Sequence, residues 1–241
     1  MAPFLESYGA QKADRCLAEF VSGVQRLGQS GLSARSRALL GEERAALIRR
    51  IDNAQHELAQ QRAALMQHST RLCSAAAVAQ RALKAANADQ TDLSRLVRDL
   101  QDAIPAYEVE ERSLRRASQW LADLEAASDN LGLRLEDDTS PEAPPEIARA
   151  VVRAISEVSV ALDAMTVSTR TSREEHEAMR TAAGGDLRLS AVMRNPLLSG
   201  SVADQDATDG NPSEMLHHLM RDMARAGQMV PKGNVQLKKL N

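Results

Sequence analysis

Residues 47–100 carry an apolar side chain at almost every seventh position, and this repeat constrains the fold more strongly than any other feature of the chain. One row of the repeat runs from Ile51 to Leu100, and a second row, offset by four positions, runs from Leu47 to Leu96. An α-helix has about 3.6 residues per turn, so it keeps a strict seven-residue stripe against a neighbour only when the two helices wind around each other. The repeat therefore predicts one long coiled-coil helix whose apolar stripe another helix covers.

Composition also favours long helices over a mixed sheet fold. Aromatic residues make up only 2% of the chain, whereas aromatic side chains normally supply much of the buried area of a globular core. The apolar content comes instead from Ala, Leu, Val, Ile and Met, alongside many Arg and Glu residues, a composition typical of long helices. We therefore expect an all-α protein that is either an elongated coiled coil or an antiparallel helical bundle.

Glycine and proline mark the ends of the first two segments. Residues 1–32 are predicted to hold an N-terminal helix, and residues 33–135 a long coiled-coil helix followed by a return helix. We place the hinge between these two helices at Pro105, because proline lacks a backbone N–H and disfavours helix at the residue before it. A helix from Ser33 to Ile104 would be on the order of 100 Å long.

The second half of the chain is predicted to contain less helix. Residues 136–146 are acidic and proline-rich, which is typical of a flexible linker. Residues 147–183 repeat the three-and-four spacing and predict a further coiled-coil helix. Residues 184–241 are predicted to be mostly disordered, except for a short methionine-rich helix over residues 213–226.

The apolar rows identify the side chains that we expect at helix–helix interfaces. Within each predicted helix they recur at steps of three and four residues, so they lie on one face. This interface set consists of Leu47, Ile51, Leu58, Leu65, Leu72, Leu93, Leu96, Leu100, Leu114, Leu121, Leu124, Leu131, Ile155, Val158, Leu162 and Met165.

Small and polar residues interrupt the seam of the long helix. Four alanines allow a partner helix to approach closely but contribute less apolar burial than leucine: Ala75, Ala79, Ala82 and Ala86. Three polar residues also occupy seam positions, where such residues cost stability and can set register and partner number: Gln61, His68 and Asp89.

The last predicted helix carries a candidate docking face for a partner. We expect Ser213 to cap its N-terminus and Gly227 to follow its C-terminus. Methionine side chains adapt to irregular grooves and are common on docking surfaces. Two alternatives remain open, docking on a partner protein and folding back onto the chain's own bundle. The face consists of Met215, Leu216, Leu219, Met220 and Met223.

No residue pattern predicts a catalytic, cofactor-binding or metal site. Cys16 and Cys73 have no histidine at helical spacing that would activate a thiol nucleophile. Glu214 and His217 form one Glu-x-x-His pair, whereas a di-metal helical bundle needs two such pairs and two further glutamates. We therefore expect no cofactor and no metal.

Charge and hydropathy limit the partners that we expect. The formal net charge is −3, so no overall field attracts nucleic acid. No segment approaches the roughly 20 apolar residues that span a bilayer, and we expect no membrane insertion. Two cysteines are too few for a disulfide scaffold and fit a reducing compartment. The expected location is the cytoplasm, with the cytoskeleton as one setting.

These features favour a non-catalytic structural coiled-coil subunit, a scaffold or spacer within a larger cytoplasmic assembly that is cytoskeletal or microtubule-associated. Its expected partners are other helical proteins, bound by coiled-coil pairing as a hetero-complex or a homodimer. An adaptor or tethering subunit in membrane traffic is the alternative, and a helical metalloprotein enzyme is the remote one. Pairing within one chain and pairing between chains both satisfy the repeat.

Overall fold

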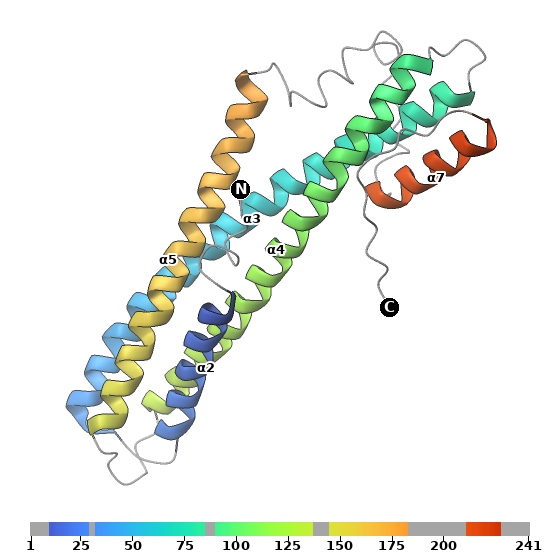
Figure 1. Cartoon of the computed structure of the whole chain (residues 1–241). Helices are drawn as coiled ribbons and strands as arrows, with labels where there is room; N and C mark the ends of the chain where they lie inside the picture. Colours follow the sequence, from blue (N-terminus) through green and yellow to red (C-terminus); the bar gives the residue numbers. More distant parts are fainter. Residues whose placement is uncertain (1–9, 29–31, 85–89, 137–144, 183–210, 228–241) are drawn as a thin grey trace. The chain divides into compact units, whose positions relative to one another are not determined.

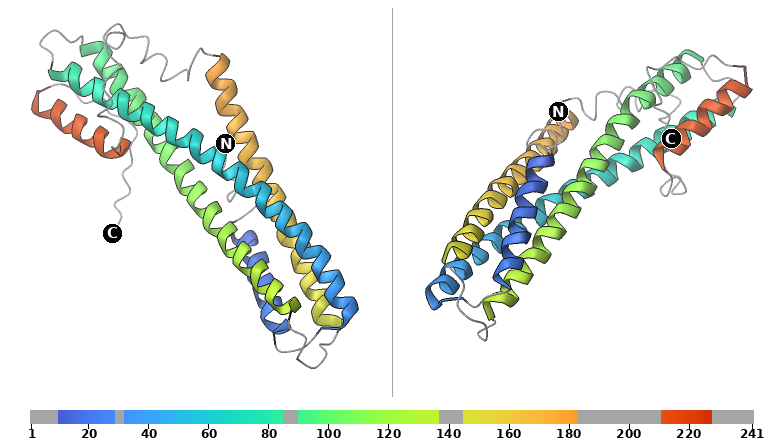
Figure 2. Two further views of the ribbon diagram at one scale, coloured as in Figure 1. Left: turned by 180° about the vertical axis from the view of Figure 1, so that it is seen from behind. Right: turned by 60° about the horizontal axis from the view of Figure 1, so that its bottom comes forward.

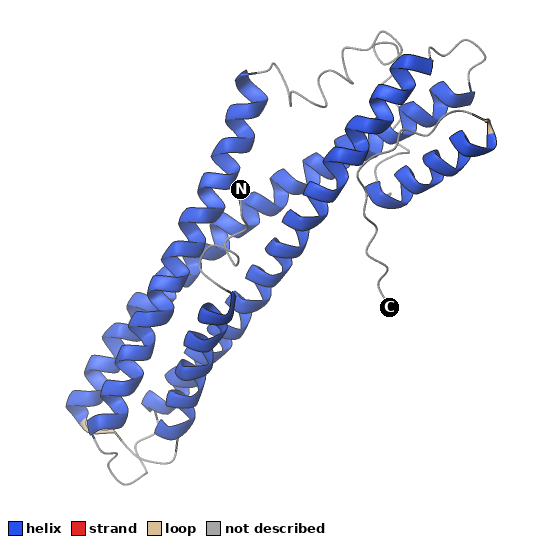
Figure 3. Ribbon diagram, in the orientation of Figure 1, coloured by secondary structure: helices blue, strands red, loops and turns tan. Residues whose placement is uncertain are grey.

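The computed structural model describes residues 10–28, 32–84, 90–136, 145–182 and 211–227. Within these ranges the structure is almost wholly helical and contains no strand (Figure 3). The prediction of an all-α fold is confirmed. The helices, coloured along the chain in Figure 1, are α2 (Ala10–Leu27), α3 (Ala34–Lys84), α4 (Gln90–Glu136), α5 (Pro145–Ala182) and α7 (Pro212–Arg225).

The helices form two compact units. Unit 1 comprises residues 1–62 and 112–172, and therefore contains α2, the first part of α3, the last part of α4 and most of α5. Unit 2 comprises residues 63–111 and 173–241, and contains the rest of α3 and α4, the end of α5, and α7. Each unit thus combines segments that are far apart in the sequence.

In unit 1, α2 packs with parts of α3, α4 and α5 (Figure 2), and most of the side chains that they bury are aliphatic. The indole Nε1 of Trp120 on α4 donates a hydrogen bond to the carbonyl oxygen of Ala13 on α2, at 3.1 Å. Gly23 allows α2 to approach α5 closely, because a Cβ atom at this position would lie 3.0 Å from Cγ2 of Val151. The largest fully buried side chains of this core are Phe20, Leu27, Leu40, Leu47, Leu124, Leu131, Ile155, Leu162 and Met165.

A second close approach joins α3 to α4 in unit 1. The Nε of Arg44 donates a hydrogen bond to the backbone carbonyl of Ser128 at 2.7 Å, and its Nη2 lies 3.3 Å from a carboxylate oxygen of Asp129. A Cβ atom at Gly132 would lie 2.7 Å from Cζ of Arg44. The guanidinium therefore lies in the space that the missing side chain leaves.

The hinge predicted at Pro105 is wrong. α3 ends at Lys84, and α4 runs from Gln90 through Pro105 to Glu136. A helical proline loses one backbone hydrogen bond, but Pro105 is exposed, whereas Leu100 and Ile104 before it are buried. The apolar face thus continues past the proline. With 51 residues, α3 is roughly 75 Å long, shorter than the helix predicted to reach Ile104.

Side chains cap the starts of two helices. At α3, the Oγ of Ser33 accepts a hydrogen bond from the backbone N–H of Ser36 at 3.2 Å. Ser213 does not cap α7. Asn211 does so through its side-chain oxygen, which accepts from the N–H of Ser213 at 3.0 Å, and Pro212 opens the helix. Proline suits the first helical position because the N–H there has no intrahelical partner.

Several predictions lie outside the described residues. They are the seam positions Ala86 and Asp89, most of the predicted acidic linker over 136–146, and most of the region 184–241 in which disorder was predicted. The ends of that linker are helical, because α4 includes Glu136 and α5 begins at Pro145.

Candidate helix-docking site

The part of α3 that belongs to unit 2 carries a row of small buried side chains. Ala75, Ala76 and Ala79 are buried, and Ala82 is half-buried beside them. Alanine ends at Cβ, and the distance between packed helices depends on the side chains at the contact, so neighbouring helices can lie close to this row. The alanines of the predicted seam therefore form the floor of a helix-binding surface.

The facing part of α4 supplies larger aliphatic side chains. They recur at steps of three and four, as the seam prediction requires, and belong to the same apolar cluster as the α3 alanines. These residues are Leu93, Leu96, Val97, Leu100 and Ile104. Together the alanines of α3 and the aliphatic row of α4 form what we call the groove of unit 2.

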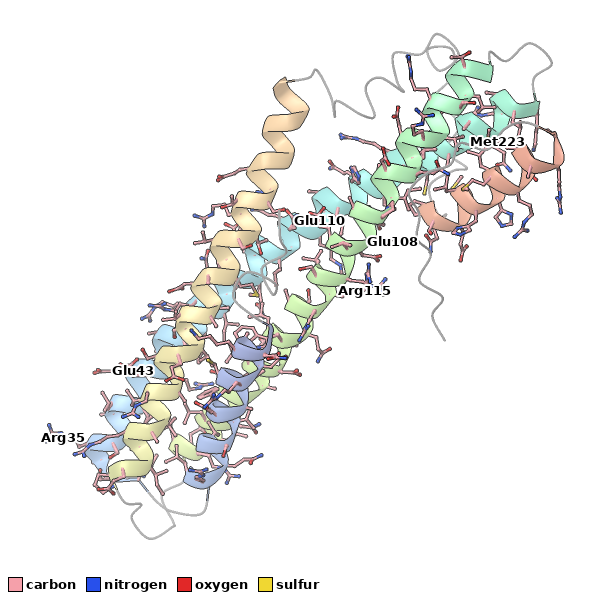
Figure 4. All side chains as sticks on the ribbon, viewed as in Figure 1. Arg35, Glu43, Glu108, Glu110, Arg115 and Met223 are labelled. Carbon is pink, nitrogen blue, oxygen red and sulfur yellow. The ribbon has the colours of Figure 1, made fainter. Side chains whose placement is uncertain are left out.

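Helix α7 lies beside the end of α3 and the start of α4 (Figures 1 and 2), and its apolar side chains pack into the cluster that forms the groove. Its anchors are Leu216, Leu219 and Met223, whose exposed fractions are 7%, 0% and 1%. They are spaced by three and four residues and thus lie on one face of the helix. Met215 and Met220 pack against the cluster from its edge and are half-buried. Met223 is labelled in Figure 4.

Two side-chain contacts between α7 and the groove involve polar groups. The amide Nε2 of Gln80 on α3 donates to a carboxylate oxygen of Asp222 at 3.3 Å. The Nε2 of Gln101 on α4 lies 3.6 Å from the sulfur of Met220. Both contacts are long, so apolar burial holds α7 in place.

The free energy of docking α7 is small for an element of this size. Fully burying a leucine or methionine side chain contributes about 1.5–3 kcal/mol, and α7 has three such anchors. The helix has only 14 residues, and isolated helices shorter than about 12–15 residues are marginal in water. Folding of α7 is therefore coupled to its docking, and the free energy cost of forming the helix offsets part of the free energy gained by burial.

Both ends of α7 are well formed. Asn211 caps the start, and the basic side chain of Arg225 lies in the last turn, where it favours the helix dipole. Gly227 follows with φ of +68°, a conformation that glycine adopts at little cost. The segment therefore carries its own start and stop signals.

An aromatic pair belongs to the same unit. The rings of His68 on α3 and Tyr107 on α4 are stacked, with centroids 6.1 Å apart and an interplanar angle of 26°. Tyr107 also packs against the apolar cluster. The polar seam residue His68 is thus accommodated by an aromatic neighbour on α4.

All sixteen residues predicted to lie at interfaces are buried within this single chain. Leu65, Leu72, Leu93, Leu96 and Leu100 belong to unit 2, and the other eleven belong to unit 1. The repeat allows pairing of helices within one chain or between chains. In this structure, these side chains pack against helices of their own chain. Their side chains already have neighbours and do not form an open stripe.

The residues of the predicted docking face, Met215, Leu216, Leu219, Met220 and Met223, lie against α3 and α4 of their own chain. Of the two alternatives, docking on a partner protein and folding back onto the chain's own helices, the structure shows α7 folded back. It also identifies what the face meets, which the sequence did not indicate.

The residues considered for chemistry are not brought together. Cys16 lies in unit 1 and Cys73 in unit 2; neither forms a disulfide, and burial raises the pKa of each thiol. Glu214 is exposed, and the Nδ1 of His217 lies 2.7 Å from the backbone carbonyl of Ser213. Within the part of the chain that the structure describes, no three His, Cys, Asp or Glu side chains cluster as metal ligands would.

Sequence reasoning missed an ion pair inside unit 1. Glu57 of α3 is largely buried and accepts hydrogen bonds from the guanidinium of Arg170 on α5. Glu57 directly precedes the seam residue Leu58, so its position at the edge of the apolar stripe could be predicted from the sequence. Its pairing with Arg170 could not be predicted, because Arg170 is distant in sequence.

Comparison with known proteins adds no relative. No protein-family model matches the chain, and no characterised protein or solved structure shows significant similarity to it. Among the described helices, none has a stretch long and apolar enough to cross a membrane.

Proposed function

We propose that this chain is a non-catalytic helical scaffold within a larger protein assembly. The observation that carries the proposal is the groove of unit 2, a helix-binding surface whose present occupant is a short helix held by three anchors. A surface built to accept a helix is a means of protein–protein interaction. The seam residues of unit 1 already pack within the chain, so we propose that partners bind at the groove of unit 2.

The cytoplasmic setting of the proposal rests on the cysteines. Neither Cys16 nor Cys73 forms a disulfide; both are buried, in different units, and their raised pKa values keep them protonated near neutral pH. Free thiols of this kind suit a reducing compartment. Within it we propose a cytoskeletal assembly, because long helices serve as spacers between binding points.

The membrane-traffic alternative receives less support. Binding to anionic lipid requires a cluster of unneutralised Lys and Arg side chains. At the start of α3, Arg44 lies against Asp129, and Arg50 forms an ion pair with Asp163. Two of the basic residues that could form such a cluster are therefore occupied by carboxylates of the same unit.

The proposal can be tested by site-specific photo-crosslinking in cells that express the full chain at its native level. A photo-activatable residue at Val109 reports on unit 2, and one at Leu133 reports on unit 1; both positions are exposed. We expect discrete crosslinked proteins in near-stoichiometric yield. A buried position, Leu124, serves as the matched control and should yield no crosslink to another protein. Recovery of the chain as a free monomer, without crosslinks from either exposed position, would contradict the proposal.

A further inference from the structure

We propose that the groove of unit 2 is a binding site for an amphipathic helix of a partner protein, and that α7 is its displaceable occupant. The proposal rests on the scaffold function above and specifies how the scaffold receives a partner. It identifies the partner by chemistry, as a helix whose apolar face repeats that of α7.

The form of the groove fits one helix. Its floor is the alanine row of α3, which admits close approach, and its wall is the aliphatic row of α4. Leu219 of α7 belongs to the same apolar cluster and is fully buried. A partner helix with leucine or methionine at steps of three and four would bury the same surface.

α7 can leave the groove while remaining part of the chain. Residues 183–210 connect α5 to the segment that begins with Asn211, and a fully extended chain of that length spans on the order of 90 Å. The stacking of His68 on Tyr107 joins α3 directly to α4. When α7 leaves the groove, the cluster loses Leu216, Leu219 and Met223, and we expect α3 and α4 to remain paired.

The edge of the groove sets the chemistry of the partner further. Gln80 and Gln101 lie at this edge, and each side-chain amide can donate hydrogen bonds through its nitrogen. In the present complex Gln80 donates to the carboxylate of Asp222, which adjoins the anchor Met223. We infer that the partner helix carries a carboxylate beside its last apolar anchor. Flexible methionines at the edge tolerate variation among partners.

The tethered α7 competes with any partner. A short flexible connection gives effective concentrations in the millimolar range, and longer ones give less. A free helix of equal intrinsic affinity therefore binds the intact chain weakly. Weakening α7 alone should open the groove to the same helix supplied in solution.

The test uses the full chain and a fluorescent peptide with the sequence of Asn211–Gly227. Leu219→Asp places a charge at the buried centre of the α7 face, and His218→Asp places the same charge at its exposed neighbour. In anisotropy titrations we expect the peptide to bind the Leu219→Asp chain at least tenfold more tightly than the wild-type and His218→Asp chains. Equal binding to all three chains, or no binding to the Leu219→Asp chain, would overturn the proposal.

Amide hydrogen exchange on the unmodified chain tests the same point without a substitution. We expect the amides of α7 to exchange at least tenfold faster than those of Ala75–Ala79 and Leu93–Leu100, because α7 opens alone. Exchange of all three segments at one rate would show that they open together and would overturn the proposal. Crosslinks from Leu133 in unit 1 would still support the scaffold function, so the two failures are distinguishable.

Discussion

Arg170 donates to a single oxygen of Glu57 through two nitrogens, Nη2 at 3.0 Å and Nε at 3.3 Å, across 113 positions of sequence. The Glu57 side chain is 8% exposed, whereas that of Arg170 is 47% exposed. The pair therefore joins α3 to α5 with its carboxylate inside unit 1 and its guanidinium at the surface. It is a structural contact, and its loss should be measurable as stability.

Arg170→Ala should destabilise unit 1 by about 1–2 kcal/mol, because it leaves a largely buried carboxylate with fewer donors. The effect is smaller than for a fully buried pair, since solvent screens the exposed guanidinium. Urea denaturation followed by circular dichroism measures it. In the double variant, Glu57→Gln should recover part of the loss; a double variant no more stable than Arg170→Ala would argue against the pair.

Two helical glycines should respond in opposite directions to alanine. Gly41 has no atom near its missing side chain, so Gly41→Ala should stabilise α3 by roughly 0.5–1 kcal/mol. Gly132→Ala would force Arg44 away from the carbonyl of Ser128 and cancel that gain or reverse it. Thermal melts of the two variants provide the comparison, and a similar gain in both would contradict the role given to Arg44.

The hydroxyl of Ser128 is an exception in the core of unit 1. The residue is 1% exposed, and its Oγ has no hydrogen-bond partner among the described residues. Ser128→Ala should therefore raise stability by about 1 kcal/mol, since it removes an unsatisfied buried group and favours helix. Thr166→Val is the matched control, because Oγ1 of Thr166 does bond to the carbonyl of Leu162 at 2.9 Å. This control should lose stability, and a loss for Ser128→Ala as well would contradict the assignment.

Alkaline pH should destabilise unit 2 through Cys73. Burial raises the pKa of its thiol above the ordinary 9.0, so the unfolded chain releases this proton at lower pH than the folded chain. The stabilising contribution is complete below pH 9 and is lost as the pH rises toward the folded pKa. Urea midpoints at pH 7 and pH 10 should therefore fall less in Cys73→Ala than in wild type. Equal falls would contradict the raised pKa.

Helix formation was predictable because it depends on local periodicity. Leu47, Leu58 and Leu72 mark the buried face of α3 from sequence alone, and all three are buried. The end of α3 at Lys84 was missed for a physical reason. The seven-residue spacing continues from Ala79 in α3 to Leu93 in α4, since both helices face the same core, and no glycine or proline lies between these two residues.

The occupant of a helix face was not predictable in the same way. The pattern of Leu216, Leu219 and Met223 indicates that something covers them, but periodicity carries no information about what does so. The same holds for Glu57 and Arg170, whose pairing depends on how α3 and α5 meet within unit 1. The hinge predicted at Pro105 was wrong, because the loss of one backbone hydrogen bond does not outweigh a continuous buried apolar face.

The interleaving of the two units has a consequence for biosynthesis. Residues 63–111 of unit 2 interrupt the sequence of unit 1. The first part of unit 1 ends at Arg62, and its second part begins at Arg112. A nascent chain emerges from its N-terminus, so α2 and the first half of α3 must wait for α5 to leave the ribosome before their core can close. Until then Phe20 and Leu47 remain uncovered on the growing polypeptide, a window in which chaperones would be needed most.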